Sequence, residues 1–276
     1  MKKAFAIVLA LFFTVAYLRH INNYGKAFYQ VDYPKEDISR ILEKENLTEE
    51  DTNLIFRQTG VSPASAEKLI RSGEGAKLLK LNELYFKTPE ISRTFVAYPV
   101  TVSEVKEEPT PLVDIKKGDI LLTPNTHTLD WRHGHCAMVL DEEKGILLEH
   151  MAIGIPSMIT NIRIWGKYPS IAILRYPDEK IAENAVSYAQ EHLIGVDYNL
   201  LAGVIKKDKS DETVPSSSHC SHIIWQAYKA AGVDIDSTGG IFVTPENLAL
   251  SEILNVVQIY GLNPGLYKER MLKKSM

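Results

Sequence analysis

One stretch of the sequence combines residue types suited to nucleophilic chemistry: serines and histidines surround Cys220. Apolar residues then recur at helical spacing until a glycine, so we expect a helix that begins close to the cysteine. Its cap is expected among Ser216 to Ser218. In the first turn of a helix, unpaired backbone N–H groups and the helix dipole favour a thiolate over a thiol. Cys220 is therefore a candidate nucleophile; the alternative is a small buried residue with no chemical role.

A cysteine nucleophile needs a base that accepts its proton and a third group that orients the base. One predicted hairpin supplies both. His135 opens an apolar strand behind a glycine, and Glu149 ends the return strand after three apolar residues. Because side chains alternate along strands, an even-sum register places the two on one sheet face, opposite or diagonal to each other. We therefore expect an imidazole–carboxylate pair; the alternative is that Glu149 faces solvent beside a turn.

Cys136 directly follows His135, and the chain contains 2 cysteines in all. Alternation points Cys136 to the face opposite His135, where we expect it to be buried packing. A disulfide between Cys136 and Cys220 would consume the nucleophile, so we predict that both are free thiols.

Imidazoles and thiols also lie close enough in the sequence to suggest a metal site. These residues are His133, His135, His219, Cys220 and His222. The recognised zinc spacings are absent, and the nucleophile interpretation already accounts for the key residues. We predict neither a metal nor a cofactor, and zinc is the minor alternative.

The elements that must position these residues follow from local patterns in the second half of the chain. Strand patterns occupy 119–123, 136–140, 146–149, 159–164, 171–176 and 253–260. Helical spacing over 179–192 predicts a further helix, and a threonine–proline pair at 244–245 starts a short one. Short strands with few helices indicate a sheet that carries the histidine and a helix that carries the cysteine.

The first half of the chain is helical in pattern. The stretch 48–51 carries a capping box, and the helix that it starts should end near Gly60. A serine–proline pair at 62–63 starts another helix, and 76–84 has a third helical pattern. An acidic, proline-bearing stretch at 104–111 is the expected boundary to the strand-rich half.

The net charge and the N-terminal sequence limit which partners and which location are expected. A formal net charge of −4 provides no basic footprint, so we exclude nucleic acid as a partner. Lys2 and Lys3 precede an apolar run over 4–18, which is the pattern of a secretion signal and is short for a membrane span. We predict an exported protein, extracellular or associated with the cell envelope. An uncleaved anchor, with membrane association through it, stays open.

Taken in order, the motifs of the strand-rich half resemble those of a known family. They are Gly118-Asp119-Ile120-Leu121, Gly134-His135-x-Ala137-x-Val139, Leu147-x-Glu149, Leu174-Arg175 and Cys220-Ser221-x-x-x-Trp225. The region 113–260 resembles the circularly permuted papain-like hydrolases, the YiiX-like relatives of the NlpC-type cell-wall peptidases. The resemblance implies an α+β fold in which a nucleophile-bearing helix packs on a small antiparallel sheet, with the histidine before the cysteine in the chain.

The resemblance also implies a role for each site residue. Cys220 would be the nucleophile, His135 the general base and Glu149 the group that orients the imidazole. The backbone N–H of Cys220 would be one oxyanion donor, and Tyr198 is a candidate for the second. Cys136 departs from the family pattern, in which a small aliphatic residue is usual.

The expected domain organisation follows from these patterns. It comprises a signal peptide or anchor over 1–18, a linker over 19–34, a helical subdomain and linker over 35–111, the permuted papain-like catalytic domain over 112–262 and a basic tail over 263–276.

The function that follows is that of an exported cysteine hydrolase, a thiol protease or amidase that cleaves an amide bond through a thioester. Export indicates a cell-wall peptide, such as a peptidoglycan stem peptide, or another amide of the envelope as substrate. Two alternatives stay open. A lipid acyl hydrolase or acyltransferase on the same fold would show a long apolar groove beside the cysteine. A non-catalytic envelope-binding module would have a cysteine of ordinary pKa.

Overall fold

In the computed structural model, the described residues are 11, 14, 27–97, 101–128, 131–202, 215–239, 242–267 and 270. Most of the predicted signal peptide or anchor over 1–18 lies outside the described residues, and so does part of the predicted basic tail. Among the residues that are described, no helix has both the length and the apolar character needed to cross a membrane.

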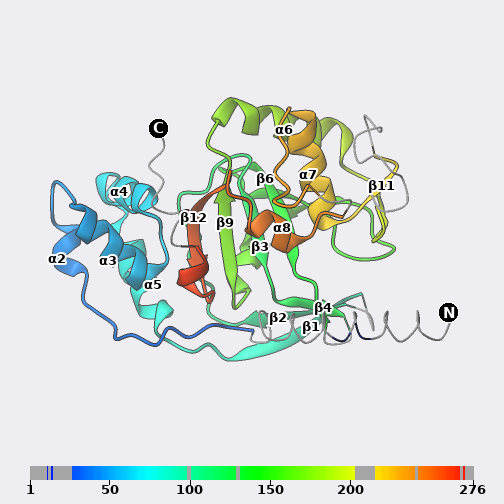
Figure 1. Ribbon diagram of the computed structural model, residues 1–276. Helices are drawn as coiled ribbons and strands as arrows, with labels where there is room; N and C mark the ends of the chain where they lie inside the picture. The colour runs from blue at the N-terminus through cyan, green and yellow to red at the C-terminus, as the bar shows by residue number, and fades with distance from the viewer. Residues whose placement is uncertain are drawn as a thin grey trace.

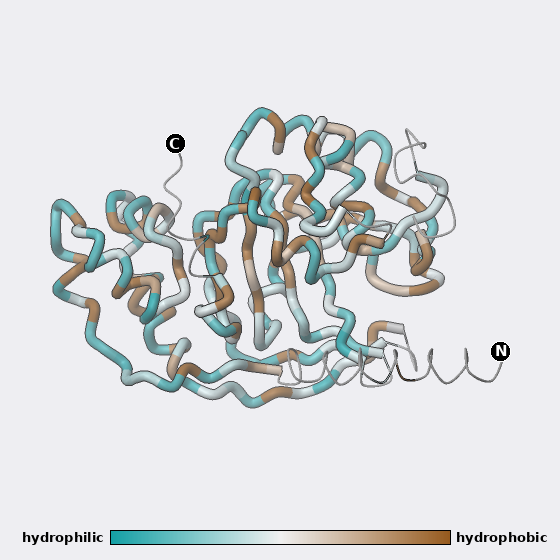
Figure 2. The backbone as a smooth tube through the Cα atoms, in the orientation of Figure 1, coloured by the Kyte–Doolittle hydropathy of each residue, from teal (hydrophilic) through white to brown (hydrophobic). Residues whose placement is uncertain are grey.

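The centre of the molecule is an antiparallel sheet of 6 strands (Figure 1). In spatial order they are β12 (Asn255–Tyr260), β9 (Ile171–Arg175), β3 (Ile120–Thr123), β6 (His135–Asp141), β7 (Ile146–Glu149) and β8 (Met158–Asn161). The central strands β3, β6 and β9 are apolar and buried at nearly every position, and they appear brown in Figure 2. Such strands must be covered on both faces. Together with the helices, the sheet makes the protein a mixed α+β structure, which confirms the predicted class.

Two helices cover one face of this sheet. α6 (Glu179–His192) and α7 (Cys220–Ala230) pack against each other and against β6 through the larger apolar core. The hydroxyl of Tyr228 in α7 donates a hydrogen bond to the carbonyl of Gly118 at 2.6 Å, which fixes the helix against the start of β3. The beginning of α7 is thereby held at the end of the sheet where β6 starts.

The opposite face is covered by a second apolar core, to which Trp165 and Tyr168 contribute. Trp165 belongs to the 3₁₀ helix η1 (Ile162–Lys167), which follows β8. The predicted strand over 159–164 is therefore wrong after residue 161. The side chain of Asn161 accepts a hydrogen bond from the backbone N–H of Arg163 at 3.1 Å, and this cap turns the chain into η1.

Residues of the predicted linker over 19–34 also pack on this face where they are described. Phe28 is buried, and its ring centroid lies 5.5 Å from that of Tyr260 in β12. The stretch from residue 27 onwards is thus part of the packed structure, because its aromatic side chains cover sheet residues that would otherwise face water.

The helical subdomain contains α2 (Ser39–Leu42), α3 (Glu49–Thr59), α4 (Pro63–Arg71) and α5 (Gly75–Tyr85). The predicted capping box of Thr48 and Asp51 starts α3, and Gly60 ends it in the left-handed conformation with φ 72°. Gly60 also lies against β12, where a Cβ atom would meet the carbonyl oxygen of Ile259 at 2.0 Å. Backbone pairing between Val61 and Gln258 joins the subdomain to the sheet.

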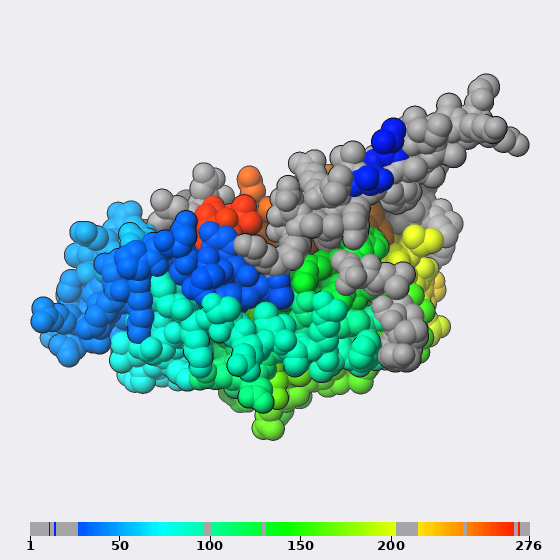
Figure 3. All heavy atoms as spheres, turned by 90° about the horizontal axis from the view of Figure 1, so that it is seen from below, coloured from blue at the N-terminus to red at the C-terminus, as the bar shows by residue number. Residues whose placement is uncertain are grey.

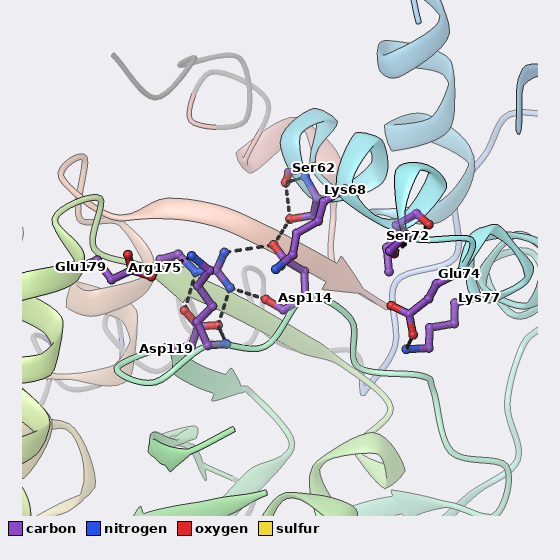
Figure 4. A network of polar contacts seen from close by, with 12 residues as sticks. Ser62, Lys68, Ser72, Glu74, Lys77, Asp114, Asp119, Arg175 and Glu179 are labelled. Carbon is purple, nitrogen blue, oxygen red and sulfur yellow. Dashed lines mark hydrogen bonds and ion pairs between the residues drawn. The ribbon is translucent and has the colours of Figure 1, made fainter. Parts of the chain in front are cut away.

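An ion-pair network fixes the same subdomain to the sheet (Figure 4). Arg175 at the end of β9 donates to both carboxylate oxygens of Asp119, at 2.7 and 2.8 Å, and to Asp114 at 2.9 Å. Asp114 in turn accepts hydrogen bonds from Ser65 and Lys68 of α4. Because Asp119 is fully buried, its charge requires the guanidinium beside it.

A further antiparallel sheet of 4 strands lies beside the cavity at Cys220. Its strands are β1 (Ile91–Ala97), β2 (Thr101–Lys106), β4 (Thr126–Thr128) and β5 (Trp131–Arg132). Figure 3 shows the teal residues of β1 and β2 as a continuous band along one face of the molecule. Local sequence patterns predict only helices and a linker between residues 35 and 111, so this sheet is an addition to the expected fold.

Shorter elements complete the surroundings of α7. They are the parallel pair β10 (Asp197–Tyr198) and β11 (Ser217–Ser218), the helix α8 (Pro245–Ala249) and the 3₁₀ helix η2 (Pro264–Leu266). The pair of β10 with β11 brings Tyr198 next to the segment that leads into Cys220.

Candidate active site

Cys220 is the first residue of α7, and it is buried, with 8% of its surface exposed. The predicted cap among Ser216 to Ser218 is wrong, because His219 occupies the N-cap position. Its Nδ1 accepts a hydrogen bond from the backbone N–H of His222 at 3.4 Å. The hydroxyl of Ser218 is instead bonded to the ring of His222 at 2.9 Å. The positive end of the helix dipole therefore lies at the sulfur, as the sequence predicts.

His135 and Glu149 form a hydrogen-bonded pair. Glu149 stands opposite Ala137 in the antiparallel register of β6 and β7, so His135 is its diagonal neighbour on the same face. The Nε2 atom of His135 lies 3.0 Å from Oε1 of Glu149. This is the relation that side-chain alternation predicts, and it leaves Nδ1 of the imidazole for another partner.

Glu149 is held by two further donors, neither of which is predicted from the sequence. The indole N–H of Trp165 donates to Oε1 of Glu149 at 2.9 Å, and the hydroxyl of Thr160 donates to Oε2. Burial alone would raise the pKa of Glu149, but the hydrogen bonds from His135, Thr160 and Trp165 outweigh it and lower the pKa. The indole also stacks on His135, with ring centroids 5.7 Å apart. The carboxylate is thus ionised and fixed, and the imidazole has one orientation.

Cys220 and His135 form a charged pair. Burial would lower the pKa of His135, but hydrogen bonds with Cys220 and Glu149 and their charges raise it to about 10. The pKa of the Cys220 thiol lies well below its usual range, because the Cys136 thiol donates to its sulfur and His135 and His219 add further polar contacts, which together outweigh burial. The resting state at neutral pH is therefore a thiolate beside an imidazolium, which is a nucleophile next to a proton donor.

Cys136 is buried, as predicted, and both cysteines are free thiols. Its interpretation as mere packing is incomplete. Alternation points Cys136 to the face on which α7 packs, and its thiol there forms a hydrogen bond with Cys220. Burial and the neighbouring thiolate raise the pKa of Cys136 well above its usual range, so Cys136 keeps its proton and donates it to the Cys220 sulfur.

Cys220 lies at the wall of a cavity of about 270 Å³. The cavity is lined mainly by apolar side chains, which include Leu122, Trp131, Met151, Ile153, Leu200 and Phe242. The cationic Arg132 in its wall is paired with Glu104 through hydrogen bonds of 2.5 and 2.6 Å. The space beside the nucleophile therefore suits hydrocarbon better than a polar chain.

Tyr198, the candidate second oxyanion donor, lines the same cavity as Cys220. Burial, and after it the negative charge of Cys220, raise the pKa of its phenol, so the hydroxyl keeps its proton and can donate. Its role as a donor stays a prediction.

Two buried histidines near Cys220 have nitrogen atoms without hydrogen-bond partners among the described residues. They are His150, at both ring nitrogens, and His219, at Nε2. The ring of His150 packs edge-on against Tyr198 at 4.9 Å, and burial lowers its pKa to about 4. No sequence motif singles out His150. Its position directly after Glu149 is the one local signal, since extended backbone there would point it to the face of Cys136.

Metal binding was the minor alternative for this group of residues. Within the described ranges, no set of three or more histidine, cysteine, aspartate or glutamate side chains is arranged to hold a metal ion. His133 makes local contacts instead: its ring nitrogens lie 3.0 Å from the Thr128 hydroxyl and 2.9 Å from the Gly134 carbonyl.

Comparisons of the chain with protein-family models, with curated proteins and with solved structures find no match.

Proposed function

We propose that this protein is a cysteine-dependent hydrolase that cleaves an acyl group from an amide or ester, and that the acyl group is apolar. The observation that carries the proposal is a thiolate of lowered pKa at the wall of an apolar cavity, beside an imidazolium that a carboxylate holds. Neither feature alone specifies the function. Together they provide the nucleophile, the proton carrier and a place for the acyl chain.

The reaction follows from the two charged partners. The Cys220 sulfur attacks the acyl carbon, and the carbonyl oxygen becomes negative while the backbone N–H of Cys220 donates to it. His135 then gives its proton to the leaving amine or alkoxide, and the bond to the leaving group breaks to form a thioester. His135, now neutral, then accepts a proton from a water molecule, whose oxygen attacks the carbonyl carbon of the thioester. The carboxylic acid is released, and the Cys220 thiolate and the His135 imidazolium are restored.

The apolar cavity favours an acyl chain over the peptide substrate that export suggests. A peptidoglycan stem peptide presents amides and carboxylates, each of which costs free energy to bury without a hydrogen-bond partner. A hydrocarbon chain gains about 0.8 kcal/mol for each methylene group that it buries. The substrate class that we propose is therefore a lipid-like amide or ester.

The fold and location of the protein remain part of the proposal. The strands with His135 and Glu149 precede the helix with Cys220 in the chain, and this order supports a permuted papain-like fold of the NlpC type. The N-terminal pattern supports export to the cell envelope and association with a membrane.

A chain-length series tests the proposal. The probes are p-nitrophenyl esters from butyrate to dodecanoate, with p-nitrophenol release as the readout and the acyl adduct on Cys220 detected by intact-protein mass. We expect kcat/KM to rise about fourfold for each added methylene group until the cavity is full. The Cys220→Ala variant should remain folded and lose all enzyme-dependent turnover.

A stem tripeptide of the peptidoglycan type is the comparison substrate. Rapid cleavage of this peptide, together with a kcat/KM that does not depend on ester chain length, would replace the lipid substrate with a cell-wall amide. Turnover that survives in Cys220→Ala would remove the cysteine mechanism altogether.

A further inference from the structure

His219 immediately precedes the nucleophile, caps α7 and adds a polar contact that lowers the pKa of Cys220, but it takes no part in the acyl transfer as described so far. Its side chain is 2% exposed and lines the cavity beside Cys220. Its Nε2 atom has no hydrogen-bond partner among the described residues. A buried polar atom without a partner costs free energy, so such an atom beside a cavity indicates a partner that binds there.

The contacts of the ring determine which nitrogen carries the hydrogen. The backbone N–H of His222 points at Nδ1 from 3.4 Å, and a backbone hydrogen cannot rotate away. Nδ1 must therefore be the acceptor, and the hydrogen of a neutral imidazole is then on Nε2. The Ser221 hydroxyl, 3.3 Å from Nδ1, donates to the carbonyl of Val243 at 2.9 Å and does not compete for this position. The free atom of His219 is thus an N–H donor.

The donor is also fixed in place. The ring packs against Phe242, with centroids 5.1 Å apart, and against His222 at 5.5 Å. As the N-cap residue, His219 stands at the N-terminus of α7, where the backbone N–H of Cys220, the first residue of the helix, has no partner within the helix. Both residues line the cavity, so their N–H groups lie at the same end of α7, next to the sulfur. A preorganised pair of donors of this kind stabilises the oxyanion of an acyl-transfer reaction.

We infer that Nε2–H of His219 is the second donor of the oxyanion hole, together with the backbone N–H of Cys220. This inference rests on the proposed acyl transfer and makes His219 a catalytic residue that touches the reacting oxygen. It competes with Tyr198 for the role. His219 keeps its own proton throughout, while His135 carries the proton that moves. The carbonyl oxygen of the substrate thus points towards the helix N-terminus, and its acyl chain extends into the apolar cavity.

The test separates the donor from the cap. Asparagine and serine at position 219 retain an acceptor for the N–H of His222, but they lack a donor at the place of Nε2. Glutamine extends a donor towards that place. The readout is the ratio of two rates on Cys220, both followed by intact-protein mass: acylation by p-nitrophenyl octanoate, which forms an oxyanion, and alkylation by iodoacetamide, which does not.

We expect His219→Asn and His219→Ser to lower the acylation rate by roughly 10²- to 10³-fold and the alkylation rate far less. His219→Gln should recover part of the acylation rate. Thermal unfolding shows whether each variant is folded. Because asparagine and serine both retain the cap, the test can still be read if one of the two variants fails to fold.

Two results would overturn the inference while leaving the proposed function intact. One is an unchanged ratio in folded His219→Asn or His219→Ser, which would make His219 a cap only. The other is a comparable loss in Tyr198→Phe with none in the His219 variants, which would make Tyr198 the donor. Absence of an acyl adduct in the wild-type protein would overturn the proposed function and this inference with it.

Discussion

The two faces of the β6–β7 hairpin differ in how their polar groups are satisfied. On one face, His135 and Glu149 bond to each other and Glu149 accepts two more hydrogen bonds. On the other face lie Cys136, which follows His135 in β6, and His150, which directly follows the end of β7. The nitrogens of His150 have no hydrogen-bond partner in the described part of the chain, and the thiol of Cys136 is hydrogen-bonded to the sulfur of Cys220.

This difference separates two tasks. The face with Glu149 contains a rigid row of donors and acceptors, which can hold a proton carrier in one orientation without any substrate. The face towards α7 retains unused hydrogen-bonding capacity close to the sulfur, where a substrate has to arrive. Neighbouring residues of a strand point to opposite faces of the sheet. One hairpin can therefore hold the imidazole of His135 on one face and leave polar atoms without hydrogen-bond partners on the face where the substrate binds.

The largest effect on turnover should come from a change at Glu149, which accepts all three hydrogen bonds on its face of the hairpin. Glu149→Gln removes the charge that raises the pKa of His135, and the amide nitrogen would direct a hydrogen towards Nε2. We expect kcat/KM for p-nitrophenyl octanoate to fall roughly 10²- to 10⁴-fold in a protein that stays folded. Wild-type activity in this variant would show that the imidazole needs no carboxylate.

The pH dependence tests whether the two faces act together on the sulfur. The lowered pKa of Cys220 keeps it ionised as the pH falls below the roughly 8.5 of a free thiol. The pKa of His135, raised to about 10, keeps the leaving-group proton in place up to that pH. Iodoacetamide alkylation should therefore continue well below pH 8.5, and turnover should decline as the pH rises through about 10.

His135→Ala is the control for this profile. Without the imidazolium, the alkylation profile of Cys220 should move to higher pH. A profile that is identical in the two proteins would mean that His135 and Cys220 do not form a charged pair.

A smaller effect is expected from the sulfur contact on the other face. Cys136→Ala removes the thiol that donates to the Cys220 sulfur, so the pKa of Cys220 should rise towards its usual value. Alkylation and turnover should fall at low pH and recover at high pH, where the thiolate forms in any case. Cys136→Ser retains a donor and should lie between alanine and the wild type. Loss at every pH in a folded Cys136→Ala protein would instead make Cys136 essential to the chemistry.

The smallest effect should come from His150. His150→Phe replaces a ring whose nitrogens lack described partners with an apolar ring of similar shape, which is close to neutral for stability. The melting temperature should stay the same or rise, and turnover should be retained. A large drop in either quantity would show that His150 has a partner, such as a bound water, and would weaken the contrast between the faces.

The sequence predicts well those features that depend on neighbouring residues. The strand at 146–149 and the helix at 179–192 have their predicted bounds, because an apolar run beside a turn and helical spacing are local signals. The pairing of His135 with Glu149 follows from the same alternation across one short turn. The mixed α+β class follows from the sum of such elements.

Features that depend on tertiary packing are not predictable in this way. The hydrogen bond between Cys136 and Cys220 requires knowledge of which sheet face α7 covers, and nothing local to either cysteine specifies it. β1 and β2 pair with each other as a hairpin, but the addition of β4 to them depends on tertiary packing, because the short stretch Thr126–Thr128 has no strand pattern of its own. His219 caps α7 in place of the serines because Ser218 is already bonded to the ring of His222.

The backbone pairing of residues 60–62 with β12 bears on how the catalytic part could be studied alone. The N–H of Ser62 donates to Val257 at 2.9 Å, and the N–H of Ile259 donates to Gly60 at 2.8 Å. β12 is an outer strand of largely buried residues, and an exposed strand of this kind recruits strands from other molecules. A fragment that begins at residue 112 would lose this cover, so we expect it to aggregate through the bare edge of β12, which the helical subdomain protects in the intact chain.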